Sequence, residues 1–80
     1  MPTVRRFARC RIAIYFGDHP PPHFHVITSS DEEIQVEIET LAILRGEADP
    51  RDTAEAIEWA ESNKEELRAQ WREYSEEDKP

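Results

Sequence analysis

All three histidines of the chain fall in one stretch of eight residues, which also holds an aspartate and three prolines: Asp18-His19-Pro20-Pro21-Pro22-His23-Phe24-His25. Histidine has an unperturbed pKa near neutrality and is a frequent metal ligand, so this grouping suits proton transfer or metal binding. A β-strand would put His23 and His25 on one face, with their Cα atoms roughly 6.5 to 7 Å apart. The stretch is therefore the first candidate for a chemical site.

Metal binding needs a third ligand beside such a pair of histidines. Tetrahedral zinc takes three or four protein groups, and the single cysteine, Cys10, excludes a cysteine-based zinc finger as well as an internal disulfide. The composition favours a structural role in which the imidazoles are solvated or bonded to the turn backbone, so we expect no cofactor and keep a divalent metal as the alternative. The candidate ligands are Asp18, His19, His23 and His25, with Glu37 as a further source of a carboxylate.

General acid–base catalysis is the other chemical interpretation. A histidine beside a carboxylate could cleave RNA without a metal, with Arg9 or Arg11 holding phosphate. The chain has no serine–histidine–aspartate order, no glycine-rich phosphate loop and no nucleophilic-cysteine signature. The sequence thus favours a protein that is not an enzyme, and the catalytic candidates are His19, His23, His25 and Tyr15.

Alternating apolar residues predict the strands that would carry these side chains. The expected strands run from Cys10 to Phe16, from about His23 to Thr28 and from Glu33 to Glu39, with a polar hairpin turn at residues 29–32. The proline run cannot donate backbone hydrogen bonds, so it must leave the sheet as an extended segment. Leu41 to Arg45 is either a short fourth strand, which we favour, or a buried turn.

Helical signals begin at Asp49, which suits an N-cap, followed by Pro50 at the first helical position. The helix should reach at least Ala60. Apolar spacing would allow one helix to continue to residue 74, but Ser62-Asn63 followed by two glutamates predicts a bend or break near residue 62. We expect an α+β fold, in which a three- or four-stranded antiparallel meander sheet is followed by one or two C-terminal helices packed on one face.

Eighty residues predict a single domain, 1–80, with a small core. We expect an N-terminal arm at 1–9, the sheet at 10–47, the helical part at 49–74 and a disordered tail at 75–80. The formal charge is −8, although the first 28 residues carry four arginines against one aspartate. That basic arm could make a weak nucleic-acid contact. No apolar run approaches the length of a bilayer span, so we expect a cytoplasmic protein without a membrane partner.

Strand parity assigns the histidines to a face. If the apolar residues of the three strands share the core face, the intervening residues point the other way, toward water in an antiparallel sheet. The expected core residues are Ile12, Ile14, Phe16, Phe24, Val26, Ile34, Val36 and Ile38. The opposite face would form a binding surface of Arg11, Tyr15, His23, His25, Gln35 and Glu37.

The segment from Ile14 to Val26 resembles the bacterial family named domain of unknown function 4160, and the resemblance continues through Leu41 to Glu47, Glu58 to Ala60 and Glu65 to Trp71. Proteins of this kind are often encoded beside a second small protein, an arrangement similar to toxin–antitoxin pairs. The resemblance implies a protein-binding or regulatory module that acts with a small partner protein. The alternatives are a small histidine- or metal-dependent hydrolase, perhaps an RNase, and a homo-oligomeric structural component.

Overall fold

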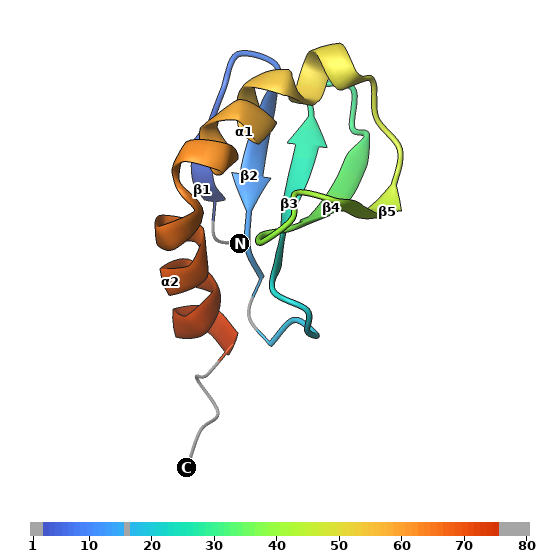
Figure 1. Ribbon diagram of the computed structural model, residues 1–80. Helices are drawn as coiled ribbons and strands as arrows, with labels where there is room; N and C mark the ends of the chain where they lie inside the picture. The colour runs from blue at the N-terminus through green and yellow to red at the C-terminus, as the bar shows by residue number, and fades with distance from the viewer. Residues whose placement is uncertain (1–2, 16, 76–80) are drawn as a thin grey trace.

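The structure is a computed structural model that describes residues 3–15 and 17–75. Five antiparallel strands form one sheet in sequential order, and two helices follow (Figure 1). The α+β meander predicted from the sequence is therefore confirmed, with one strand more than expected. The strands are β1 Thr3–Arg6, β2 Cys10–Ala13, β3 His23–Thr28, β4 Glu33–Glu37 and β5 Ile43–Gly46, and the helices are α1 Pro50–Ser62 and α2 Lys64–Ser75.

The additional strand comes from the expected N-terminal arm. β1 pairs with β2, placing Arg6 opposite Arg11, and the register shifts between Thr3 and Arg5. The charged residues of this strand are exposed, and only Val4 packs against the core. The strand has no apolar alternation because it lies at the edge of the sheet, which explains why the sequence pattern did not predict it.

Two strands are shorter than predicted because the chain turns out of the sheet earlier. β2 ends at Ala13, although Ile14 stays buried, and Phe16, an expected core residue, lies outside the described residues. β4 ends at Glu37, and Ile38 is buried in the following turn, where its N–H donates to the Pro22 carbonyl at 3.1 Å. The ambiguous segment after it does contain a strand, β5, that begins two residues later than expected.

The helical part divides at Asn63, as the sequence predicted. Asp49 caps α1 through a hydrogen bond from the Arg51 N–H to its carboxylate, with Pro50 as the first helical residue. The Asn63 side chain donates to the Trp59 carbonyl at 2.8 Å, which satisfies a free carbonyl at the end of α1. Ser75 is the last residue of α2, and the remainder of the expected tail, 76–80, lies outside the described residues.

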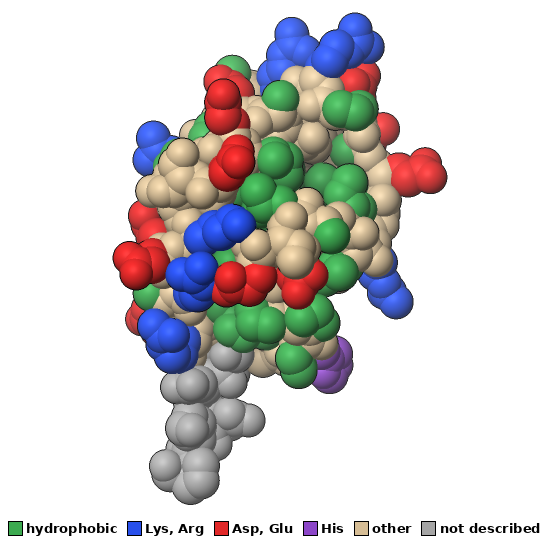
Figure 2. Space-filling model, in the orientation of Figure 1, with side chains coloured by type: hydrophobic (Ala, Val, Ile, Leu, Met, Phe, Trp, Pro, Cys, Tyr) green, Lys and Arg blue, Asp and Glu red, His purple; other side chains and the backbone are tan. Residues whose placement is uncertain are grey.

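The hydrophobic core lies between the helices and one face of the sheet. The helices contribute Ala56, Ala60 and Leu67, all fully buried, and charged side chains of both signs cover the helical side of the molecule (Figure 2). Neither described helix is long and apolar enough to cross a membrane. The described residues of the predicted core face are all buried: Ile12, Ile14, Phe24, Val26, Ile34, Val36 and Ile38.

Candidate metal centre

The two histidines of β3 point away from the hydrophobic core, as strand parity predicted, but they are not in water. His23 is 4% exposed and His25 is 5% exposed. The Tyr15 ring packs edge-on against His25 with centroids 4.4 Å apart, and Trp71 of α2 lies 5.1 Å from the His23 ring. The expectation of a solvated face is therefore wrong here, because the segment between β2 and β3 and part of α2 cover both imidazoles.

His25 has a carboxylate on each side of its ring. Its Nδ1 lies 2.7 Å from Oε2 of Glu33, and its Nε2 lies 3.0 Å from Oδ2 of Asp18. Both partners are carboxylates, which accept hydrogen bonds strongly, and the shorter of the two contacts, the one to Glu33, favours a proton on Nδ1. In the neutral ring that arrangement leaves a lone pair on Nε2, directed at Asp18.

His23 has a tautomer set by the backbone. Its Nδ1 lies 2.8 Å from the Pro21 carbonyl oxygen, which can only accept, so Nδ1 carries the proton. Its Nε2 lies 3.0 Å from Oδ2 of Asp18, yet this nitrogen is buried and makes no hydrogen bond. A lone pair facing a carboxylate at that distance is unfavourable unless a proton or a metal ion lies between them, since an unpaired buried polar atom costs about 1 to 3 kcal/mol.

Asp18 is held in place by the backbone that follows it. Its Oδ1 accepts a hydrogen bond from the His19 N–H at 3.1 Å, which leaves Oδ2 directed at both imidazoles. Partial burial raises the pKa of this carboxyl, but the hydrogen bond that it accepts when His25 Nε2 carries a proton, together with the neighbouring His23, outweighs burial, and the net pKa lies below its ordinary value. The carboxylate is therefore ionised at neutral pH and can serve as a ligand.

Asp18, His23 and His25, here called the Asp–His–His site, bring two imidazole nitrogens and one carboxylate oxygen within 4.8 Å of one another. Neighbouring ligand atoms around an ion held at about 2.1 Å lie roughly 3 to 3.5 Å apart, close to the two nitrogen–oxygen distances of 3.0 Å. Metal-binding histidines usually donate their other N–H to a carbonyl or a carboxylate. Pro21 and Glu33 supply both kinds of partner.

Several residues predicted from the sequence lie outside this cluster. His19 is exposed and contributes only its backbone N–H, while the Glu37 carboxylate accepts from the Thr40 hydroxyl. Tyr15 touches the site through its ring, and burial followed by the charge of Glu33 raises the pKa of its phenol. Arg11 and Gln35 belong to the same face, paired across the strands with Ile27 and His25, respectively.

Sequence reasoning missed two contributors to the site. Glu33 is two residues before Gln35 on β4, so the parity that placed Gln35 and Glu37 on the histidine face would have included it. The second is Trp71, which packs against the core cluster while its ring also lies near His23. No local pattern predicts that second contact, because it depends on where α2 lies relative to the end of the sheet.

The fold and the site together define a small α+β protein with a cluster of two buried histidines and one partly buried aspartate. The chain belongs to the family described as domain of unknown function (DUF4160), whose profile matches residues 10–72, a range that includes all three residues of the cluster. Neither a curated protein nor a solved structure matches the chain.

Proposed function

We infer that this protein binds one divalent transition-metal ion at the Asp–His–His site. The observation that carries the inference is the convergence of the Asp18 carboxylate with two buried Nε2 atoms whose Nδ1 partners are already fixed. The expectation that the histidines have only a structural role gives no reason for His23 to direct an unpartnered nitrogen at a carboxylate. A metal ion satisfies all three groups at once.

The donor set indicates the class of metal. Two imidazole nitrogens with one carboxylate oxygen suit Zn²⁺, Fe²⁺ or Mn²⁺, whereas Ca²⁺ and Mg²⁺ prefer oxygen ligands alone. Three protein ligands leave at least one coordination position for water, as in catalytic rather than structural zinc sites. A metal lowers the pKa of bound water and polarises a bound oxygen, so hydrolysis is the reaction class that the site suits best.

Protons on the two Nε2 atoms are the alternative to a metal ion at this site. If each Nε2 carried a proton, both imidazolium rings could face Asp18, and the cluster would be a buried ion-pair network without metal. The two accounts differ in what they require of the ligands, because metal binding needs all three side chains together and displaces protons from the imidazoles.

Metal affinity can be measured by competition with a chromophoric chelator, using protein purified without a histidine tag. The proposal predicts one Zn²⁺ per chain, with binding lost in Asp18→Ala, His23→Ala and His25→Ala. His19→Ala is the matched control, because it removes an exposed imidazole from the same segment and should bind Zn²⁺ as the wild type does. Equal affinity in wild type and His23→Ala would overturn the proposal.

A second candidate function is the binding of a partner protein, which the family resemblance implied. The feature that favours it is the edge strand β5, where Ile43 is 59% exposed and Leu44 is 41% exposed. An exposed edge can pair with a strand of another chain, and apolar side chains strengthen such a contact. The toxin–antitoxin-like pairing and the cytoplasmic location stay predictions.

Light scattering over a range of concentrations tests the homo-oligomeric form of that candidate. Ile43→Glu should dissociate an assembly formed through β5, whereas a constant monomer mass in the wild type would leave a different protein as the only partner to seek. The same substitution leaves all three ligands of the Asp–His–His site intact, so metal binding serves as the control for folding.

A further inference from the structure

A cleft of about 330 Å³ opens beside the Asp–His–His site. One wall is formed by Asp18, His19 and the first prolines, and the other by Leu44 and Arg45 of β5, with His23 and Gln35 between them. His25 is opposite Gln35 and Gln35 is opposite Arg45 in the strand register. Arg45 is thus two strands from His25 on the same face, roughly 10 Å away in the direction of the hydrogen bonds.

Arg45 is available to a ligand. Its guanidinium makes no hydrogen bond or ion pair with any residue that the structure describes. It also lines an adjoining hollow of about 290 Å³ together with Glu33, Gln35 and Gly46. Because the same side chain borders both spaces, a ligand in the cleft would have a cationic group at its edge.

The charge of the cleft depends on the metal. With neutral imidazoles, the charges of Asp18 and Arg45 cancel, and the Glu33 carboxylate that contacts His25 adds one negative charge, so a bound divalent ion leaves an excess of one positive charge. A loaded cleft therefore attracts anions, whereas the metal-free cleft does not. By linkage, an anion that contacts the ion must also strengthen metal binding by the same factor.

We propose, resting on the metal site inferred above, that the cleft binds the phosphate group of a phosphate ester between the metal ion and Arg45. One non-bridging oxygen takes the open coordination position, and the others accept hydrogen bonds from the guanidinium. The planar fork of arginine matches phosphate geometry, and a cleft of this size accommodates a group as large as a nucleotide.

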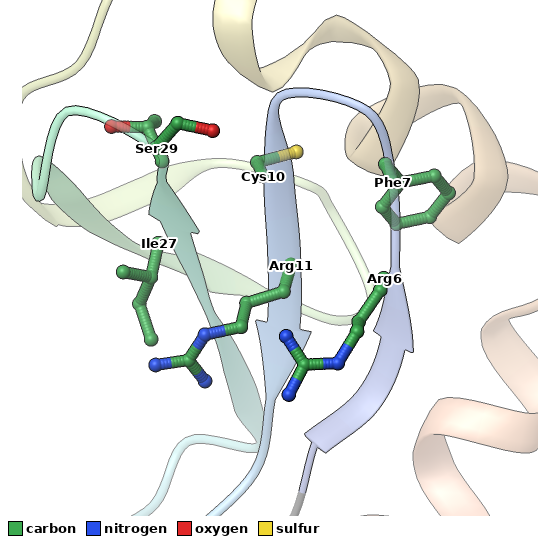
Figure 3. A pocket seen from close by; sticks show the side chains of 7 residues that line it. Arg6, Phe7, Cys10, Arg11, Ile27 and Ser29 are labelled. Carbon is green, nitrogen blue, oxygen red and sulfur yellow. The ribbon is translucent and has the colours of Figure 1, made fainter.

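A pair of arginines lies on the other side of the site from Arg45. Arg6 and Arg11 extend to the same side of β1 and β2 and line a hollow of about 210 Å³, while the Cys10 thiol points away from them (Figure 3). In the register of β2 and β3, Arg11 is a diagonal neighbour of His25. A phosphodiester chain that crosses the face could reach both the cleft and this hollow, whereas a mononucleotide could reach only the cleft.

Cobalt-loaded protein provides the test, because d–d absorption reports directly on ligands of the ion. Adenosine 5′-monophosphate should perturb the Co²⁺ spectrum of the wild type and bind roughly 10- to 100-fold more weakly to Arg45→Gln, since hydrogen bonds to charged groups contribute that much. Arg9→Gln is the control. It removes the same charge from a side chain that pairs with Asp52 of α1.

A single-stranded oligonucleotide distinguishes the two sources of the phosphate ester. Arg6→Gln should leave binding of the mononucleotide unchanged, but it should weaken the oligonucleotide and lower the magnitude of its salt slope by about 0.7. An unchanged slope, with Arg45 still required, would support a small phosphate ester as the ligand.

The Co²⁺ experiment distinguishes failure of the phosphate proposal from failure of the metal site. If Co²⁺ does not bind to the wild type, both fall. If Co²⁺ binds but the mononucleotide leaves its spectrum unchanged, or if Arg45→Gln binds the mononucleotide as the wild type does, the metal site stands and the phosphate proposal is overturned.

Discussion

On one face of the sheet, Phe24 and Val26 of β3 are fully buried among apolar side chains, while on the other face His23 and His25 of the same strand are buried to nearly the same degree. The apolar residues need only be covered, because removal from water is itself favourable. The histidines need a partner for each ring nitrogen, and one of their four nitrogens has none. Equal burial therefore hides a difference: burial alone satisfies the first face, whereas on the second face one buried nitrogen has no hydrogen-bond partner among the described residues, and the proposed metal ion would supply one.

The largest expected effect is the loss of Phe24 from the apolar face. Phe24→Ala should lower the free energy of unfolding by about 3 to 5 kcal/mol, because it leaves a cavity in a small core. Chemical denaturation measures this change. The metal should still bind to whatever fraction remains folded, and a loss below 1 kcal/mol would mean that this face does not hold the fold.

The second-largest expected effect is stabilisation of the histidine face by a bound metal ion, in contrast to stabilisation of the apolar face by burial. Zn²⁺ at one hundred times its dissociation constant should stabilise the wild type by about 2.7 kcal/mol, because it binds the folded chain preferentially. Thermal or chemical unfolding with and without Zn²⁺ gives the value. His25→Ala should show no stabilisation, and His19→Ala should keep it in full. Equal stabilisation of the two variants by Zn²⁺ would mean that the metal binds elsewhere.

Gly46 lies where the backbone of β5 approaches β4 closely, opposite Ile34. It has a φ of +85°, and a Cβ at this position would lie 2.2 Å from the Glu33 carbonyl oxygen. Gly46→Ala should cost about 1 to 3 kcal/mol and displace β5 from β4. Hydrogen exchange should show faster exchange in β5 and unchanged protection in β2. Equally faster exchange in all strands would contradict a local effect of Gly46.

Glu33 offers a smaller change on the histidine face. Glu33→Gln keeps an acceptor for the His25 N–H but removes the negative charge. Zn²⁺ affinity should therefore fall about tenfold, the lower limit of the effect usually seen when a hydrogen-bond partner of a metal ligand is replaced. Chelator competition measures the affinity. Glu37→Gln, on the same strand but bonded to Thr40, is the matched control and should have no effect.

The smallest effect comes from an exposed pair between the β4–β5 turn and α2. The hydrogen bond from Arg68 lowers the pKa of Glu39 below its ordinary value of 4.5. Because the folded pKa is the lower one, the stabilisation is present above pH 4.5 and is lost as pH falls through the folded pKa. Arg68→Gln should therefore lower the melting temperature slightly at pH 7, and the difference from the wild type should shrink as the pH falls below 4.5.

The sequence was sufficient to predict most of the fold. Alternation identified β3 and β4, the Asp49-Pro50 pair located the start of α1, and Asn63 marked the break between helices. β1 was missed because its outward residues are arginines and it carries little apolar signal. Strand ends were misjudged where Ile14 and Ile38 remain buried after leaving the sheet, so burial continued the pattern beyond the hydrogen bonds.

The sequence named the three residues of the Asp–His–His site as candidates, but it did not predict which segments surround them. Parity assigned His23 and His25 to the same face, and the sequence named Asp18 as a candidate ligand. What a periodic pattern cannot give is the path of the segment between Ala13 and His23, which folds back so that Asp18 meets both rings and Pro21 offers its carbonyl. For that reason the two histidines are buried rather than solvated as parity predicted, while the rest of the expected surface remains partly exposed.

Anomalous diffraction at the zinc edge tests the central claim most directly. Crystals of the wild type grown with Zn²⁺ should show one peak about 2.1 Å from Nε2 of His23, Nε2 of His25 and a carboxylate oxygen of Asp18, with both Nδ1 contacts retained. A peak only at the exposed His19, or none within reach of the three ligands, would contradict the account.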